Sequence, residues 1–354
     1  MSMKRILLGT TALLGSGLLA AGSASAAEVK AGGAFDLTIS GFARFLANAG
    51  DYQARTGLAK GSNGLDFSND TEVNILGKAT DESTGIEYGF RIEFEADTNE
   101  TANTDETWLF ISGQFGEFRF GDEDGASDNM ALGAQTIAVG TGGIDGTLVD
   151  QGAVVKLSDS SDSTKLIYYS PKFAGFQLGV DYTPHSSNNN GRQGAGSGVA
   201  NLMTGEVKDW FSAGLAWTGD LGPAGVKASV TGMYGTDESG DRDGDTRGVS
   251  AGAVVDIYGF SVAGAWGTEE VLGFERSFYN LGAAAALGPV KVSINWGDAY
   301  DTDGAEPWDM VLGAEVGLMP GVAFSVEWSH FDTDRGGAGD DSGDLGVARL
   351  AFSF

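Results

Sequence analysis

Cysteine is absent from the 354 residues, so no disulfide stabilises this chain. Its start nevertheless has the pattern of a secretory signal peptide. Lys4 and Arg5 precede an apolar run over residues 6–21, and the small residues Ala24 and Ala26 supply a cleavage site. Small exported modules usually depend on disulfides. An exported chain without cysteine therefore predicts an extensively hydrogen-bonded or packed domain.

Long hydrophobic runs are also missing. The apolar run near the start is shorter than the ~20 residues that a spanning helix needs, and no comparable run occurs again. We therefore expect residues 1–26 to be removed as a signal peptide and residues 27–354 to form one domain without a helical anchor. Such a protein belongs in the periplasm, outside the cell or in the outer membrane.

Basic residues are few, since 21 Lys and Arg stand against 49 Asp and Glu, a net charge of −28 at pH 7. A field of this sign repels nucleic acid and anionic polymers, so we expect no nucleic-acid partner. Proline is rare, with 6 residues, whereas glycine is abundant, with 57. Glycine well above its average share, without a collagen period, suits many tight turns and close strand packing.

Helical periodicity is hard to find, whereas alternation with a period of two recurs along the chain. Between residues 86 and 96 the even positions are apolar and the odd positions are charged or glycine. We predict sixteen strands, at approximately residues 34–48, 65–78, 86–97, 105–114, 117–121, 164–171, 175–183, 208–218, 224–235, 247–257, 259–268, 277–288, 289–298, 307–317, 321–331 and 343–354. Their connections alternate between short turns with Gly or Pro and long polar loops.

An even number of strands, short turns at one end and long loops at the other predict an all-β fold, a sixteen-stranded antiparallel transmembrane β-barrel. A soluble sandwich also alternates, but so few large aliphatic residues would fill its core poorly. A barrel of sixteen strands leaves an aqueous channel. An aromatic girdle is expected on its outer face, at Tyr88, Tyr169, Tyr182, Trp217, Tyr234, Trp266, Trp296 and Trp328.

One long connection, residues 122–163, has neither a strand nor a helix pattern. Structureless insertions of this length are usually functional or disordered. Lys156 is its single base, and its acids include Asp122, Glu123, Asp124, Asp128, Asp145 and Asp150. We interpret it as the third external loop, folded into the barrel to narrow a water-filled passage. The alternative is a solvated surface loop.

The segments GFARF, LDFSNDTEVNILGKATDESTGIEYGFRIEFEA, WLFISGQFGEFRFGDEDGAS and IYYSPKFAGFQLGVDYTP, with a terminal Phe354, resemble the trimeric Gram-negative general porins, particularly their alphaproteobacterial branch. The resemblance covers essentially the whole mature chain. It implies that the third loop forms a constriction whose acids face bases on the wall. The matching bases here are Arg44, Arg91, Arg119 and Arg349.

The chain departs from that pattern on its second strand, where relatives often carry bases and this chain has Asp70 and Glu72. The constriction should therefore carry an excess of negative charge. We expect an outer-membrane homotrimer in contact with lipid and lipopolysaccharide. Its function would be passive diffusion of small hydrophilic solutes and ions, with a preference for cations.

Two alternatives remain open. A substrate-specific channel would need a line of aromatic side chains in the lumen, for which Trp108, Phe110 and Trp210 are the candidates. A hydrolase or protease at the barrel rim would need a histidine, and the chain has His185 and His330 without a nucleophile motif. We therefore expect no enzyme activity.

No cofactor is expected, although clustered carboxylates on glycine-bearing loops can bind Ca²⁺ loosely. The clusters do not fit the EF-hand frame. The weak candidates are Asp241, Asp243, Asp245, Asp301 and Asp303.

Overall fold

The computed structural model describes residues 27–30, 35–52, 65–96, 104–145, 156–186, 207–237, 245–302, 304–334 and 341–354. Within these ranges the chain forms seventeen strands, one short α-helix and two short 3₁₀ helices. The strands are β1 (Ala27–Lys30), β2 (Asp36–Tyr52), β3 (Leu65–Asp81), β4 (Ile86–Glu95), β5 (Thr107–Gly113), β6 (Gly116–Asp122), β7 (Thr164–Tyr169), β8 (Phe176–His185), β9 (Val207–Leu221), β10 (Ala224–Asp237), β11 (Thr246–Ile257), β12 (Phe260–Val271), β13 (Phe274–Leu287), β14 (Val290–Asp301), β15 (Glu306–Met319), β16 (Val322–Asp334) and β17 (Asp341–Ser353).

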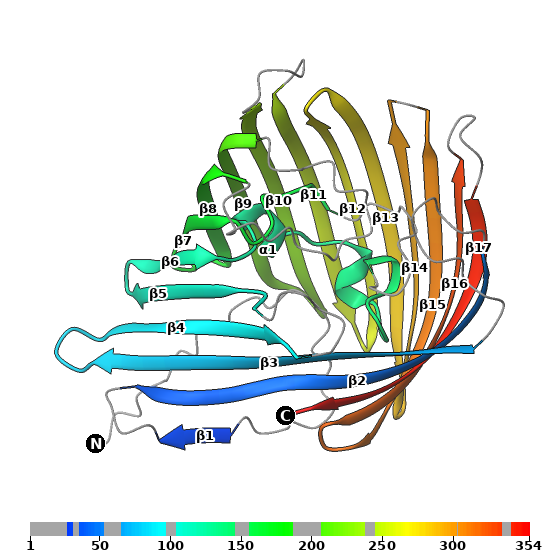
Figure 1. The fold of residues 1–354 in the computed structure, drawn as a ribbon, viewed down its shortest axis with the longest axis horizontal. Helices are drawn as coiled ribbons and strands as arrows, with labels where there is room; N and C mark the ends of the chain where they lie inside the picture. Colours follow the sequence, from blue (N-terminus) through cyan, green and yellow to red (C-terminus); the bar gives the residue numbers. More distant parts are fainter. Residues whose placement is uncertain are drawn as a thin grey trace.

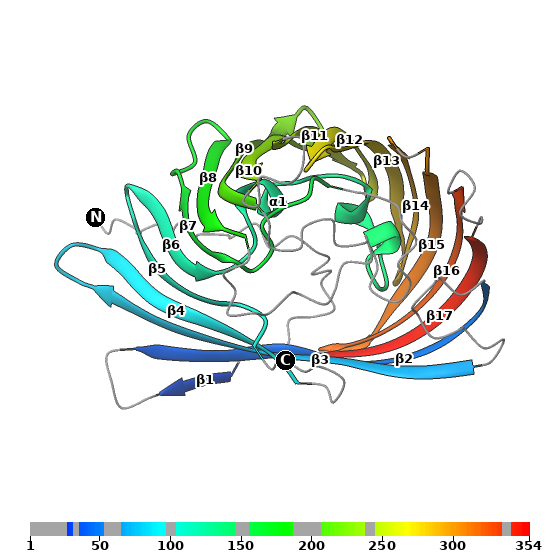
Figure 2. The ribbon, with the colours of Figure 1, turned by 45° about the horizontal axis from the view of Figure 1, so that its top comes forward.

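Strands β2 to β17 form a closed antiparallel barrel (Figures 1 and 2). Each pairs with its neighbours in the sequence, and β17 pairs with β2 to close the ring, with Ser353 opposite Phe42. The short strand β1 pairs with the first residues of β2, beyond the part of β2 that pairs with β17. Ala27 lies opposite Ile39, and Lys30 lies opposite Asp36. All sixteen barrel strands were predicted from the alternation, whereas β1 was not.

The predicted and observed strand limits differ between β12 and β13. The predicted strands end at residue 268 and begin again at residue 277, but β12 and β13 continue to a turn at Leu272 and Gly273. Gly273 has a φ of 81°, which glycine adopts at little cost. Val271 and Leu272 are buried with Phe278 and Trp210 on the inner side. This tertiary packing, which alternation cannot show, keeps the segment in the sheet.

The two faces of the barrel differ as the alternation predicts. Neighbouring residues on β13 and β14 illustrate this, since Leu281 is 59% exposed while Asn280 and Asn295 are fully buried. Outward aromatic side chains include Tyr88, Tyr234, Trp266 and Trp328. A continuous apolar outer band with interfacial aromatics is typical of a barrel that crosses a membrane with its strands.

The prediction that Tyr169 belongs to the girdle was wrong. Lys165, Ile167 and Tyr169 are the buried residues of β7, whereas Leu166 points outward and is 43% exposed. Tyr169 packs inside the barrel with Met130 and Ile167. The adjacent Tyr168 takes the outward position, where it packs against Phe118.

The helices are α1 (Ala126–Asn129), η1 (Ala134–Ile137) and η2 (Gly143–Asp145), all between β6 and β7. Among the described residues, no helix is long and apolar enough to cross a membrane.

Candidate functional site

The connection between β6 and β7 lies against the inner face of the barrel (Figure 2). Helix α1 contacts β8, β9 and β10, η1 contacts β12, β13 and β14, and η2 contacts β14 and β15. These contacts concern residues 123–145 and 156–163, because residues 146–155, including the predicted Asp150, lie outside the described part. We call residues 123–163 the inner loop.

The N-terminal end of α1 is fixed to the wall by its own peptide N–H groups. Ala126 N donates to Asp181 Oδ2 at 2.6 Å, and Ser127 N donates to Ser212 Oγ at 3.0 Å. Asp181 and Ser212 are inward residues of β8 and β9, and both are about 4% exposed. A helix start leaves several N–H groups without partners inside the helix, so acceptors on the wall determine where α1 lies.

Further along, side chains of three more strands hold the inner loop. Ala134 N donates to Asn280 Oδ1 at 2.8 Å, and Val139 N donates to Ser293 Oγ at 3.1 Å. The hydroxyl of Thr141 donates to Glu327 on β16. The first part of the loop is therefore attached from β8 to β16, across the lumen from β2 and β3 (Figure 2).

Apolar packing supports the same path. Met130 packs with Ile167 and Tyr169, and Leu132 packs with Val254 and Ala263. The returning arm also packs inward, because Leu157 is buried with the following inner-face residues: Val207, Trp210, Met233, Val271, Leu272, Phe278 and Ala299. This side of the lumen is filled, whereas the charged inner faces of β2 to β4 and β17 lie opposite.

Each of the four predicted wall bases has an acidic neighbour. Arg44 Nη1 lies 2.8 Å from Asp70 Oδ2, and Arg91 pairs with Glu93. Arg349 Nη2 lies 2.9 Å from Glu315 Oε2. Arg44 and Asp70 retain side-chain exposures of 30% and 27%, so this pair faces water.

Arg119 lies against an acid of the inner loop, and two aromatic rings enclose its guanidinium. Its guanidinium lies over the rings of Trp108, at 4.4 Å, and Tyr169, at 5.1 Å, and pairs with Glu117 and Glu123. Only 14% of its side chain is exposed. Arg119 therefore fixes the start of the inner loop rather than presenting a free charge to the lumen.

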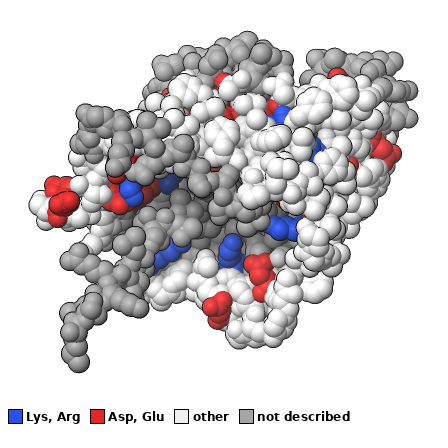
Figure 3. Space-filling model, turned by 90° about the horizontal axis from the view of Figure 1, so that it is seen from below, with Lys and Arg blue, Asp and Glu red and all other residues white. Residues whose placement is uncertain are grey.

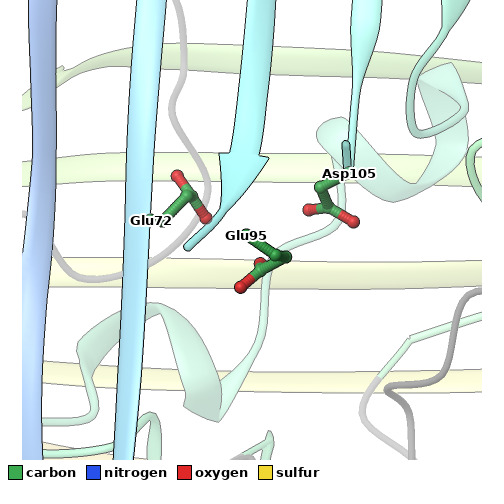
Figure 4. Close-up of side chains that lie close together, drawn as sticks. All are labelled: Glu72, Glu95 and Asp105. Carbon is green, nitrogen blue, oxygen red and sulfur yellow. The ribbon is translucent and has the colours of Figure 1, made fainter. Parts of the chain in front are cut away.

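Glu72, by contrast, faces other acids. Its carboxylate accepts a hydrogen bond from Asn74 Nδ2 at 2.6 Å. Carboxylate oxygens of Glu72, Glu95 and Asp105, from β3, β4 and the residues before β5, lie within 4.8 Å of one another (Figure 4). No basic side chain of the described residues forms an ion pair with Glu72 or Asp105.

A second group of carboxylates lies where the inner loop leaves and rejoins the wall. Oxygens of Glu106, Asp124 and Asp162 lie within 4.8 Å of one another. Burial, strengthened by repulsion from Glu93, raises the pKa of Glu106 to about 9. Burial, strengthened by Asp105, raises the pKa of Asp162 to about 7. Both carboxyl groups therefore bind protons near neutral pH.

Both groups of carboxylates have the spacing that a hard cation needs. Acidic groups at this spacing are common without an ion, and we assign no metal to either group.

The predicted weak Ca²⁺ candidates lie elsewhere. Asp241, Asp243 and Asp303 are outside the described residues. Asp301 is paired with Arg276 at 2.6 Å, and Asp245 accepts a hydrogen bond from Tyr234 at 3.0 Å. Among the described residues, neither Asp245 nor Asp301 lies in a group of three side chains close enough to share a metal ion.

The remaining predicted loop acids are engaged locally. Asp128 Oδ1 lies 2.7 Å from Lys156 Nζ, and Asp122 accepts a hydrogen bond from Thr164. Glu123 is 4% exposed, whereas Asp145 is exposed. Sequence reasoning missed the anchors Asp181 and Ser212, because nothing in a strand pattern shows which wall residues a distant loop will reach.

The histidines do not form a catalytic arrangement. His330 points outward between Trp308 and Trp328, and its Nδ1 lies 3.1 Å from Asp344 Oδ1. His185 lies on β8, far along the ring from β16.

In the view of Figure 3, both basic and acidic side chains border a central hollow.

A closed barrel with an apolar outer band and a charged, loop-crossed interior defines the class of outer-membrane β-barrel channels. Comparison with known proteins gives the family: the chain belongs to the Gram-negative porins, whose family model matches residues 9–336. An uncharacterized protein of Rickettsia conorii is 25% identical over 309 residues, which cover 65% of this chain and 70% of the relative.

Two solved structures share the barrel. An anion-selective porin from Comamonas acidovorans superposes with a TM-score of 0.64 at 17% identity, covering 90% of this chain and 100% of that chain. The trimer form of OmpT, an outer membrane protein of Vibrio cholerae, gives a TM-score of 0.60 at 12% identity, covering 90% and 99%. The protein is thus a diffusion channel of the Gram-negative outer membrane and not an enzyme, which excludes the rim hydrolase.

Proposed function

We propose that this porin is a cation-preferring, general diffusion channel for small hydrophilic solutes, and that it works as a homotrimer. The observation that carries the cation preference is the pairing of charges on the inner wall. Arg44, Arg91, Arg119 and Arg349 are each neutralised by an acid of the same wall or of the inner loop. Glu72 and Asp105 form no ion pair within the described residues.

The size of the effect follows from Coulomb's law. Two unit charges ~4 Å apart interact by about 1 kcal/mol in bulk water and several-fold more in less polar surroundings. Charges within ~8 Å of a passing ion remain effective at physiological salt. A few uncompensated carboxylates would therefore favour a monovalent cation over an anion by roughly 1 to 2 kcal/mol, tenfold or somewhat more.

The Comamonas porin is anion-selective on a similar barrel. This contrast is consistent with selectivity being determined by side chains rather than by the barrel. In this chain the second barrel strand supplies Asp70 and Glu72 to the inner wall. We infer that these two acids make this channel prefer cations.

A substrate-specific channel is less well supported. Trp210 is fully buried in the apolar cluster around Leu157, and Trp108 lies under Arg119. Neither ring is free to form an aromatic line along the lumen. A general channel that sorts solutes by size and charge needs no such line.

The homotrimer is supported by the OmpT trimer form and by the apolar outer band. Electrophoresis in mild detergent without boiling should show a species near three times the monomer mass, with light scattering as a second measurement. A monomer in both experiments would contradict the trimer.

Channel function itself is tested with proteoliposomes. Swelling in solutions of small sugars should be fast and should slow as the sugar becomes larger. Planar bilayers should show stepwise conductance, and a salt gradient should give a zero-current potential of the cation-selective sign. Vesicles that do not swell would contradict the diffusion channel, and an anion-selective sign would contradict the cation preference alone.

A further inference from the structure

The inner loop runs over a row of glycines on the barrel wall. These glycines face inward on β8, β9, β11, β13 and β15, and they are Gly179, Gly214, Gly252, Gly282 and Gly313. The loop reaches them in order, with Met130 over the first two and then Leu132, Ala134 and Val139 over the other three. We call these five residues the glycine row.

The approach is closest at Gly252. A methyl group added there would overlap the carbonyl oxygen of Leu132, which is a main-chain atom and cannot rotate away. At Gly313 an added Cβ would lie 2.9 Å from Val139 Cγ2 and 3.0 Å from Val139 O. Real Cβ contacts are essentially never shorter than 3.0 Å, so an alanine at either position would require the loop to shift away from the wall.

A second observation agrees with a fixed position. Strands of the same wall hold the loop with polar side chains, because Ser293 on β14 accepts from Val139 N and Ser212 on β9 accepts from Ser127 N. The hydrogen bonds set the loop's position along the wall, while the glycines allow its main chain to lie directly on the wall. Closely packed interiors transmit displacements of this size rather than absorbing them.

We propose that Gly252 and Gly313 are positioning residues that set the size limit of the pore, by determining how far the inner loop stands from the wall and therefore how far it extends into the lumen. This inference rests on the proposed diffusion function. Side-chain atoms added to the wall beneath the loop would move the loop away from that wall, toward the charged inner faces of β2 and β3. The abundance of glycine thus serves the lumen as well as the turns.

The test compares Gly252→Ala and Gly313→Ala with Gly317→Ala. Gly317 lies on β15 with Gly313, four positions along on the same face, and a Cβ there meets nothing within 4 Å. We expect the first two variants to reduce single-channel conductance by about twofold, because permeation depends steeply on pore diameter. They should also slow the swelling of vesicles in larger sugars more than in small ones, and Gly317→Ala should match the wild type.

A suppressor distinguishes loop position from general damage. Val139→Ala removes Cγ2, the atom that an alanine at position 313 would meet most closely, while Val139 O remains. Gly313→Ala with Val139→Ala should therefore recover part of the lost conductance. If Gly313→Ala only weakened the fold, a second truncation in the same packing would weaken it further. If Gly252→Ala does not yield a folded barrel, the Gly313 pair still decides the question.

The outcomes separate this inference from the proposed function. A wild type that does not conduct would contradict the diffusion channel. Two results with a conducting wild type would overturn the role of the glycine row and leave the channel function intact. One is unchanged or larger conductance in both Gly252→Ala and Gly313→Ala. The other is a loss of conductance in Gly317→Ala as large as in those two variants.

Discussion

Arg44 on β2 and Asp70 on β3 lie directly opposite each other and form an ion pair, with Arg44 Nη1 2.8 Å from Asp70 Oδ2. The same guanidinium lies 3.6 Å from the centre of the Phe42 ring. Arg44 is therefore held by groups of its own wall. An acid on β3 reduces the local positive field in the lumen, which is the basis of the cation preference proposed here.

The first prediction removes this neutralising charge. Asp70→Asn leaves Arg44 in place without its partner, so the positive field of Arg44 should reach passing ions. The zero-current potential in a salt gradient should shift toward anion permeation, by a few-fold in the permeability ratio. Planar-bilayer recordings of purified protein measure this shift.

The control for Asp70→Asn uses an ion pair on the other face of the barrel. Arg247 Nη2 lies 2.7 Å from Glu270 Oε2, and Arg247 points outward with 70% of its side chain exposed. Glu270→Gln also frees a guanidinium but should leave ion selectivity unchanged. Equal shifts in the two variants would mean that overall charge, and not the position of Asp70, controls permeation.

The second prediction concerns Lys156, the single base of the inner loop. It pairs with Asp128 at 2.7 Å and also attracts Asp124 and Asp145. Lys156→Gln should therefore increase repulsion within the loop, lower the melting temperature of the barrel and add noise to the open-channel current. About a third of the lysine is exposed, so we expect a loss of roughly 1 to 2 kcal/mol, below that of a fully buried pair.

Lys172→Gln is the matched control for Lys156, because Lys172 is exposed in the turn between β7 and β8. Arginine at position 156 keeps the charge and should keep a quiet channel. A noisy Lys156→Arg channel, or an equally noisy Lys172→Gln channel, would argue against the ion pair as the cause.

The third prediction is a dependence of stability on pH. The pKa of Asp162 is raised from 3.8 to about 7, and that of Glu106 from 4.5 to about 9, in both cases mainly by burial. The folded barrel therefore binds these protons more tightly than the unfolded chain. The stabilisation that these two protons give the folded barrel is complete below the pKa values of the unfolded chain. It is lost as the pH rises toward about 7 for Asp162 and about 9 for Glu106.

Thermal unfolding in detergent at pH 5, 7 and 9 measures this effect. The melting temperature should fall as pH rises, and the fall should be smaller in Asp162→Asn and Glu106→Gln. Because both groups gain charge over the same range, cation preference should also increase with pH. A wild-type melting temperature that rises steadily to pH 9 would contradict the assignment.

Period-two alternation was sufficient to predict the barrel, because a strand with one face toward lipid and one toward water must alternate. It also placed Arg44, Asp70 and Glu72 on the inner face. Alternation carries no information about what lies over that face. For this reason the sequence predicted Arg119 as a wall base without showing that the rings of Trp108 and Tyr169 lie against its guanidinium.

The path of the inner loop is likewise determined by contacts between residues far apart in the sequence. Ala134 and Asn280, for example, are 146 positions apart. The loop's acidic composition predicted its place near ions, but not that Lys156 would pair with Asp128. The excess of glycine was interpreted through turns and strand packing, and its use beneath the loop becomes visible only with the loop in place.

The most direct test of the proposed cation preference is the zero-current potential of the wild-type channel in a salt gradient, recorded beside a variant with Asp70→Arg and Glu72→Arg. We predict the cation-selective sign for the wild type and a clear shift toward anions in the variant, since both acids face the lumen. A wild type that prefers anions, or a variant indistinguishable from it, would contradict the account.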